Sequence, residues 1–237
     1  MSGIVLYGPA IAPYTEKVVR GLGLKKLPFE LKEPQEPEDY RRWSPETGLL
    51  PVLAFDGEPA IGDSTRILIE LDKRFPNPPL LASDPSVAAR QRRLEDWADE
   101  SFFWYWNQWR TMLEERGDLE PAEPYQFSWA RPSSWFESLR AAGAGAVVDR
   151  SRERFLLAEI DHRMDDLLAW LGPRPYFYAD EPSMADLAVY AMLRNIRGGT
   201  FGPGGVACLE RRPPLLDFMR RIEDRTGAPP AAAPAAV

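Results

Sequence analysis

Cysteine and histidine are almost absent from this chain of 237 residues, which contains only Cys208 and His162. A single cysteine excludes a disulfide within the chain and leaves too few thiol and imidazole ligands for a structural zinc site. A lone histidine also argues against a catalytic triad built on that residue. We therefore expect no metal site, and chemistry carried out by hydroxyls, main-chain groups or the reactive atom of a bound cofactor.

The chain also lacks a positive charge excess and long apolar runs. Its net charge is -7, which argues against nucleic acid or an anionic membrane as the main partner. No stretch of about 18 apolar residues is present to span a bilayer. The start, residues 1–4, has neither the charged region nor the apolar region of a signal peptide. We expect a cytoplasmic protein.

The first eighty residues have the pattern of an α/β domain. Apolar Ile4–Tyr7 ends at Gly8-Pro9, and Pro13 suits the first turn of a helix. Asp56-Gly57 between two apolar runs indicates a β-hairpin. We predict strands at 4–7, 29–32 and on both sides of the hairpin turn, and helices from 13 to about 21 or 23, at 38–43 and at 64–75. The prolines at 76–79 resemble a linker.

The remainder is predicted to be helical. Residues 85–115 form one long helical pattern that is dense in aromatics, and residues 151–171 have a regular apolar stripe. Ser183 and Asp186 match a capping box before the next helix, and 213–225 suggest a last one. We read 1–80 as one domain and 85–227 as a second, with an extension at about 117–150 and a disordered tail at 228–237. The glycine-rich segment 198–205 is predicted to be a loop, and it lacks the residues of a phosphate-binding loop.

Four short motifs, in order, resemble the cytosolic glutathione transferase superfamily. They are Leu6-Tyr7-Gly8, Ala12-Pro13-Tyr14 with Lys17-Val18, Leu50-Pro51-Val52-Leu53, and Gly62-Asp63-Ser64 before a helix. The resemblance covers roughly residues 3–225. It implies a thioredoxin-like α/β N-terminal domain, an all-α C-terminal domain and a homodimer.

The resemblance also implies a glutathione site, with glutathione as co-substrate. Leu50 would offer its main-chain N–H and C=O to the cysteinyl part, held out by a cis Pro51. Asp63 and Ser64 would hold the γ-glutamyl end at a helix N-terminus. The alternative for Asp63 and Ser64 is simple helix capping, and the alternative for Pro51 is an ordinary proline at a strand start.

Two positions depart from the family pattern. Ala12 stands where many members place a serine or cysteine that acts on the thiol, and Leu49 stands where a lysine or glutamine often meets the glycyl carboxylate. With Cys208 as the only thiol, disulfide-exchange chemistry is disfavoured. The remaining candidates for thiol activation are Tyr7, where another branch keeps a catalytic tyrosine, and Thr15. Tyr7 is equally compatible with packing between the domains.

The aromatic segment supplies candidates for the acceptor pocket. Trp104, Trp106 and Arg110 are expected to border it, although most aromatics in this segment must pack in the core. The hypothesis is an enzyme that conjugates the glutathione thiolate to a small apolar electrophile. The alternative is a non-catalytic protein of the same fold that binds glutathione or an apolar ligand.

Overall fold

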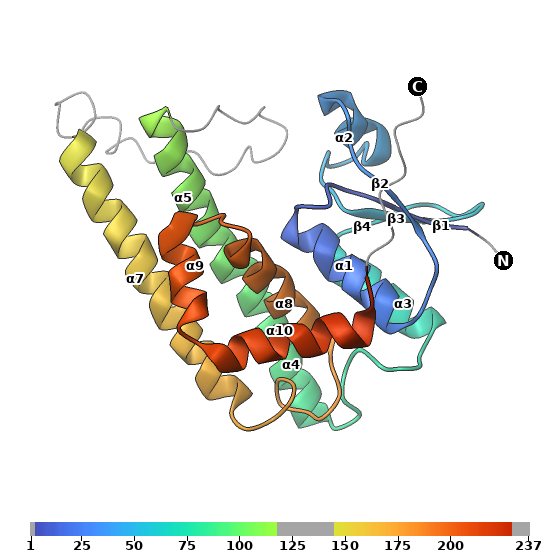
Figure 1. Ribbon diagram of the computed structural model, residues 1–237. Coiled ribbons are helices and arrows are strands. Elements are labelled where there is room, and N and C mark those ends of the chain that lie inside the picture. The colour runs from blue at the N-terminus through green and yellow to red at the C-terminus, as the bar shows by residue number, and fades with distance from the viewer. Residues whose placement is uncertain (1–2, 118–144, 229–237) are drawn as a thin grey trace.

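The computed structural model of the protein describes residues 3–117 and 145–228 (Figure 1). Most of the extension expected at 117–150 and of the tail expected at 228–237 lies outside these residues. Within them, a small sheet with its helices comes first in the chain and a group of helices follows.

The sheet has four strands in the order β2-β1-β3-β4. Strand β1 (Ile4–Tyr7) pairs in parallel with β2 (Glu30–Lys32) and antiparallel with β3 (Val52–Phe55), which continues into β4 (Ile61–Gly62). The hairpin predicted at Asp56-Gly57 is confirmed, and Gly57 takes the positive φ of 76° that such a turn favours.

Three helices accompany the sheet: α1 (Pro13–Leu24), α2 (Pro37–Trp43) and α3 (Ser64–Arg74). Helix α1 buries Val18, Val19 and Leu22 and packs against α3. Its far end approaches the last helix so closely that a Cβ at Gly23 would lie 2.3 Å from the carbonyl oxygen of Thr226. This half has the predicted thioredoxin-like arrangement.

The second half contains α4 (Pro85–Trp97), the π-helical turn η1 (Ala98–Phe102), α5 (Phe103–Arg116), α7 (Gly145–Leu171), α8 (Met184–Arg197), α9 (Gly202–Glu210) and α10 (Pro213–Thr226). Helix α8 is buried along most of its length and contacts α1, α4, α9 and α10, so it forms the centre of this half. The predicted capping box of Ser183 and Asp186 at its start is confirmed. The predicted fold class, an α/β domain followed by helices, is also confirmed.

Two predicted elements differ in detail. The single helix expected at 85–115 is interrupted by η1, a local change of hydrogen bonding that apolar periodicity does not reveal. The loop expected at 198–205 becomes helical from Gly202, because Pro203 occupies the first turn, where its missing N–H has no helical acceptor to lose. Among the described helices, none is both long and apolar enough to cross a membrane.

A buried charge cluster joins α1 to α3, α4 and η1. The Lys17 ammonium is fully buried; it lies 3.1 Å from Thr65 Oγ1 and 2.7 Å from Asp99 Oδ2, and it also contacts the Glu95 carboxylate. Burial lowers the pKa of Lys17, but the Asp99 and Glu95 carboxylates outweigh it, so that this pKa is raised overall. One cation thus faces two carboxylates, and burial raises the pKa of Asp99 to about 6.

This cluster predicts a pH-dependent effect of Asp99→Asn. Because the folded-state pKa of about 6 exceeds the ordinary 3.8, the folded protein binds this proton more tightly than the unfolded chain. Ionisation of Asp99 therefore costs folding stability as the pH rises from 4 toward 6. The free energy of unfolding of Asp99→Asn should rise relative to wild type across that window, by up to about 3 kcal/mol.

Urea unfolding at a series of pH values measures this difference. Asp96→Asn is the matched control, because Asp96 is an exposed aspartate near the end of α4, three residues before Asp99. A stability difference between Asp99→Asn and wild type that does not change between pH 4 and 6 would contradict the raised pKa of Asp99.

Candidate functional site

A cavity of about 1950 Å³ opens between the sheet half and the helical half. The sheet half contributes the loop before α1, the segment between α2 and β3, β4, and the start of α3. Helices η1 and α5 contribute most of the opposite wall, and α8 contributes Asn195. Of the residues predicted to bind glutathione or the acceptor, all seven line this one cavity: Leu50, Pro51, Asp63, Ser64, Trp104, Trp106 and Arg110.

Leu50 presents an unused pair of main-chain groups to this cavity. The Leu50–Pro51 peptide bond is cis, as the resemblance implied, and Leu50 lies just before β3. Neither its N–H nor its C=O has a hydrogen-bond partner in the part of the chain that the structure describes. An extended peptide could pair with these groups as an additional short strand.

The start of α3 has the features of an anion-binding site and lies at the same cavity as Leu50. Asp63 is the N-cap residue, and its Oδ1 accepts the N–H of Arg66 at 2.9 Å. Ser64 follows it, 5% exposed, with a hydroxyl that has no partner among the described residues. The N–H groups of Ser64 and Thr65 belong to the first turn and have no helical acceptor. Asp63 therefore caps the helix, and the Ser64 hydroxyl could bind a ligand.

Asp63 has an unusual backbone conformation, with φ 72° and ψ 122°. Such conformations cost about 1–3 kcal/mol in non-glycine residues and occur preferentially at functional sites. This conformation starts α3 abruptly after β4, so that the first turn of the helix faces the cavity.

The start of α1 is a second place with free N–H groups. Its N-cap, Ala12, has no side-chain oxygen to accept them, and Pro13 has no N–H. The N–H groups of Tyr14 and Thr15 have no acceptor among residues 3–117 and 145–228. Together with the helix dipole, they favour a negatively charged atom in front of α1. A thiolate is one such atom.

The side chains of Tyr7 and Thr15, expected to act on the thiol, do not line the cavity. The Tyr7 ring packs on Trp43 with ring centroids 4.8 Å apart. The Thr15 hydroxyl is buried without a partner beneath Gly8, where an added Cβ would lie 2.5 Å from it. The alternation of β1 and the helical turn of α1 direct these two side chains into protein contacts, which motif matching does not predict.

Tyr14 lines the cavity but its phenol is already engaged. The hydroxyl donates to the main-chain oxygen of Asp99 at 2.9 Å, and burial raises its pKa above the ordinary value of 10.0. Its ring meets Phe103 edge to face at 5.7 Å. Tyr14 therefore stays neutral and fixes the start of α1 against η1 and α5.

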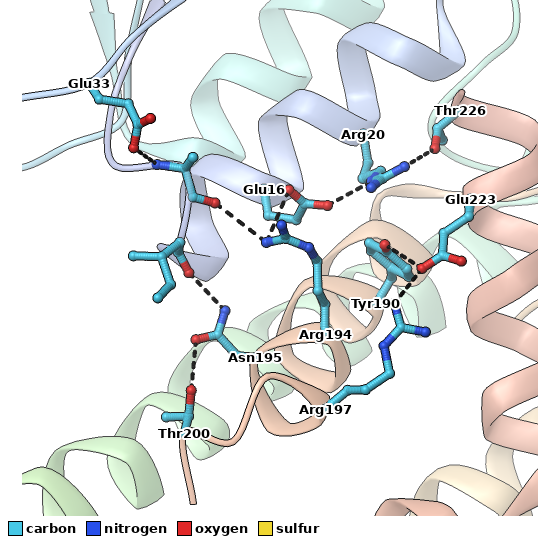
Figure 2. A network of polar contacts seen from close by, with 12 residues as sticks. Glu16, Arg20, Glu33, Tyr190, Arg194, Asn195, Arg197, Thr200, Glu223 and Thr226 are labelled. Carbon is cyan, nitrogen blue, oxygen red and sulfur yellow. Dashed lines mark hydrogen bonds and ion pairs between the residues drawn. The ribbon is translucent and has the colours of Figure 1, made fainter. Parts of the chain in front are cut away.

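Helix α8 holds the loop that precedes α1 (Figure 2). Asn195 Nδ2 donates to the Ile11 carbonyl at 3.0 Å, and Thr200 donates to Asn195 Oδ1 at 3.3 Å. Arg194 Nη1 lies 3.4 Å from the Ala10 carbonyl oxygen, and it also pairs with Glu16. These contacts fix the main chain on which the N–H groups of α1 depend. The sequence contains no motif that identifies Asn195, so pattern reasoning missed it.

The opposite wall of the cavity is aromatic. Phe103 and Trp106 lie with ring centroids 5.7 Å apart, and Trp104 is 49% exposed. The Arg110 guanidinium lies over Trp106 and donates to Glu114 at 2.7 Å. An apolar molecule in the cavity could therefore rest on this wall while facing the start of α1.

Other chemically distinctive residues lie away from the cavity or contribute little charge to it. Cys208 is buried, and burial raises the pKa of its thiol, so it is not poised as a nucleophile. Leu49 is 49% exposed at the cavity wall and places no cation there. Within the described residues, no three His, Cys, Asp or Glu side chains are grouped in a way that could hold a metal ion.

Comparison with known proteins agrees with this geometry. Residues 6–79 match the family Glutathione S-transferase, N-terminal domain, and residues 146–227 match Glutathione S-transferase, C-terminal domain. The chain is 22% identical over 226 residues to isoprene-epoxide–glutathione S-transferase of Rhodococcus sp. strain AD45, covering 90% of this chain and 92% of that protein.

Solved structures show the same fold. A glutathione S-transferase of Methylobacterium radiotolerans in complex with glutathione sulfonate is similar with a TM-score of 0.62 and 23% identity, covering 99% of each chain. One from Rhodospirillum rubrum has a TM-score of 0.62 and 21% identity, covering 98% of this chain and 96% of that one. Both domains match in their usual order, and the cavity lies where the motifs meet. The chain belongs to the glutathione S-transferase superfamily.

Proposed function

We propose that this protein is a glutathione transferase that joins the glutathione thiolate to a small electrophile with an apolar body. One observation carries the proposal: a single cavity brings together an aromatic wall, the main chain of Leu50 and the hydroxyl of Ser64, the last two without partners among the described residues. The main chain of Leu50 and the hydroxyl of Ser64 suit the peptide and carboxylate groups of glutathione, and the wall suits an apolar co-substrate.

The peptide would lie along the sheet half. Its γ-glutamyl carboxylate would receive the Ser64 hydroxyl and the N–H groups at the start of α3. The ammonium beside that carboxylate would face Asp63, whose Oδ2 is not used in capping. The cysteinyl N–H and C=O would pair with Leu50, which directs the sulfur toward the start of α1.

Thiol activation would then come from the main chain of α1. The N–H groups of Tyr14 and Thr15 would donate to sulfur, and the helix dipole would add to their effect, so that the thiolate is favoured and its pKa falls. The thiol proton leaves to solvent and sulfur forms a bond to the electrophilic carbon. A halide departs with its electron pair, or an epoxide C–O bond opens and the oxygen takes a proton from solvent.

A non-catalytic binding protein is the second candidate. Ala12 and Leu49 favour it, because the first removes a hydroxyl from the thiol site and the second removes a cation from the glycyl end. This second candidate would bind glutathione or an apolar ligand, and it would differ from the enzyme in having no turnover. We further propose a homodimer, as in the family, with glutathione as the co-substrate.

Retention on glutathione-agarose followed by an assay with chlorodinitrobenzene and with styrene oxide separates the candidates. The enzyme hypothesis predicts retention and thioether formation with at least one of these electrophiles. Retention with neither product formed supports the binding protein instead. Failure of glutathione to bind, measured by calorimetry, would contradict the transferase and a glutathione-binding protein, and would leave only a protein that binds an apolar ligand.

Ser64→Ala should raise the KM for glutathione about tenfold or more, since a hydrogen bond to a charged group contributes about 1.5–3 kcal/mol. The value of kcat should change less, because Ser64 is placed far from the sulfur. Steady-state kinetics with glutathione varied measures both constants. Ser86→Ala is the matched control: Ser86 also lies in the first turn of a helix, and it donates to Asp84. Equal effects of the two substitutions would remove Ser64 from the site.

Ala12→Ser should lower the pKa of the bound glutathione thiol, because a hydroxyl at the N-cap of α1 adds one donor beside the sulfur. The pH dependence of kcat/KM and the ultraviolet absorbance of the thiolate report this pKa. An unchanged pKa would place the sulfur away from α1.

Tyr7→Phe should leave kcat nearly unchanged, because the Tyr7 side chain does not line the cavity. A tenfold loss of kcat would instead assign the Tyr7 phenol a role in the mechanism.

A further inference from the structure

Asn107 on α5 is a buried residue whose carboxamide lies at the cavity without a partner among the described residues. The residue as a whole is only 6% exposed. The amide nitrogen and oxygen are not among the enclosed side-chain atoms that lack a partner, so they reach the cavity, where water can bind them until a ligand displaces it. The structure thus leaves two N–H donors and a carbonyl oxygen available at the cavity wall.

Two other amides at this cavity show the contrast. Asn195 donates to the Ile11 carbonyl and accepts from Thr200, and Gln108 accepts from Arg152 Nη2 at 2.8 Å. Both are engaged with the protein itself. Asn107 is engaged with nothing described, although it is the most buried of the cavity-lining residues of α5.

The position of Asn107 relates it to the proposed site of sulfur. Phe103, Asn107 and Thr111 are spaced by four residues and line the cavity as one row on α5. Phe103 begins this row and touches Tyr14, whose N–H belongs to the thiol site. Asn107 lies one helical turn farther, about 6 Å along the axis. A small molecule resting on Phe103 with its reactive carbon at the sulfur would reach this amide.

We propose that Asn107 binds a hydrogen-bond-accepting oxygen of the electrophile. The acceptor class is then an apolar, preferably aromatic, molecule that bears a carbonyl or epoxide oxygen near its reactive carbon. This inference rests on the proposed function and narrows it, because the aromatic wall alone would accept a hydrocarbon halide equally well.

The same hydrogen bond also suits the reaction. When sulfur bonds to the β-carbon of an enone, the alkene electron pair shifts and negative charge collects on the carbonyl oxygen as an enolate. The α-carbon then takes a proton from solvent, and the ketone re-forms. In an epoxide, the C–O bond breaks and its electron pair stays on oxygen until a proton arrives from solvent. An N–H of Asn107 directed at that oxygen would bind it more strongly as negative charge develops.

Binding of a matched pair of ligands tests the amide without requiring turnover. Acetophenone and α-methylstyrene have nearly the same shape and differ by an oxygen in place of a methylene group. Quenching of tryptophan fluorescence gives both dissociation constants. Asn107→Leu should weaken acetophenone about tenfold relative to α-methylstyrene, the effect of losing one net hydrogen bond. Thr111→Val, the next position in the row, is the control and should leave this ratio unchanged.

Turnover provides the second readout. The ratio of kcat/KM for benzylideneacetone to that for benzyl chloride should fall about tenfold in Asn107→Leu, while the KM for glutathione stays constant. Thermal unfolding completes the set: Tm should be nearly unchanged, because leucine has a similar size and the substitution removes no hydrogen bond within the described residues. Asn107→Ala takes its place if the leucine variant does not fold.

The outcomes separate this inference from the proposed function. Loss of discrimination between the ligands in Asn107→Leu, without conjugation by wild type, supports the oxygen subsite and contradicts the transferase. Conjugation with ligand discrimination intact in the variant contradicts the subsite alone. A lower Tm with equal weakening of both ligands would assign Asn107 a structural role and overturn the inference.

Discussion

The buried ammonium of Lys17 fixes the relation between the two halves of the molecule. It reaches Thr65 on α3, Glu95 on α4 and Asp99 in η1 from a position on α1, within one enclosed cluster. Because a charge buried without partners is very costly, these elements can separate only by exposing it or by leaving it unpaired. The starts of α1 and α3, whose free N–H groups face the cavity, are thus held in a constant relation to α5.

Several polar groups that line the cavity have no hydrogen-bond partner among the described residues. Leu50 offers a main-chain donor and acceptor, Ser64 offers a hydroxyl and Asn107 offers an amide, all without partners among the described residues. Other polar groups at the cavity are engaged with the protein, as Tyr14 is with Asp99 and Asn195 is with Ile11. Asp99 Oδ1, by contrast, is enclosed without a partner. Leu50, Ser64 and Asn107 all line the same cavity, so the proposed peptide and its acceptor would share one site.

Much of this arrangement could be predicted from short motifs. Leu50-Pro51 and Asp63-Ser64 are each a pair of adjacent residues, so the local geometry of each pair follows from turn and helix-start chemistry. The structure places both pairs at the cavity. Tyr7 and Thr15 could not be placed this way, because which neighbour a side chain meets depends on strand pairing and helix packing. Asn107 and Asn195 match no sequence motif: Asn195 depends on Ile11, which is distant along the chain, and Asn107 depends on which side of α5 faces the cavity.

The most direct test is a crystal structure with glutathione bound. We expect the cysteinyl main chain to pair with Leu50 and the γ-glutamyl carboxylate to bind Ser64. We expect the sulfur to lie within about 3.5 Å of the Tyr14 or Thr15 nitrogen, slightly farther than an oxygen acceptor would lie. A sulfur directed at the Tyr7 hydroxyl, or a peptide bound without contact to Leu50 and Ser64, would contradict this placement.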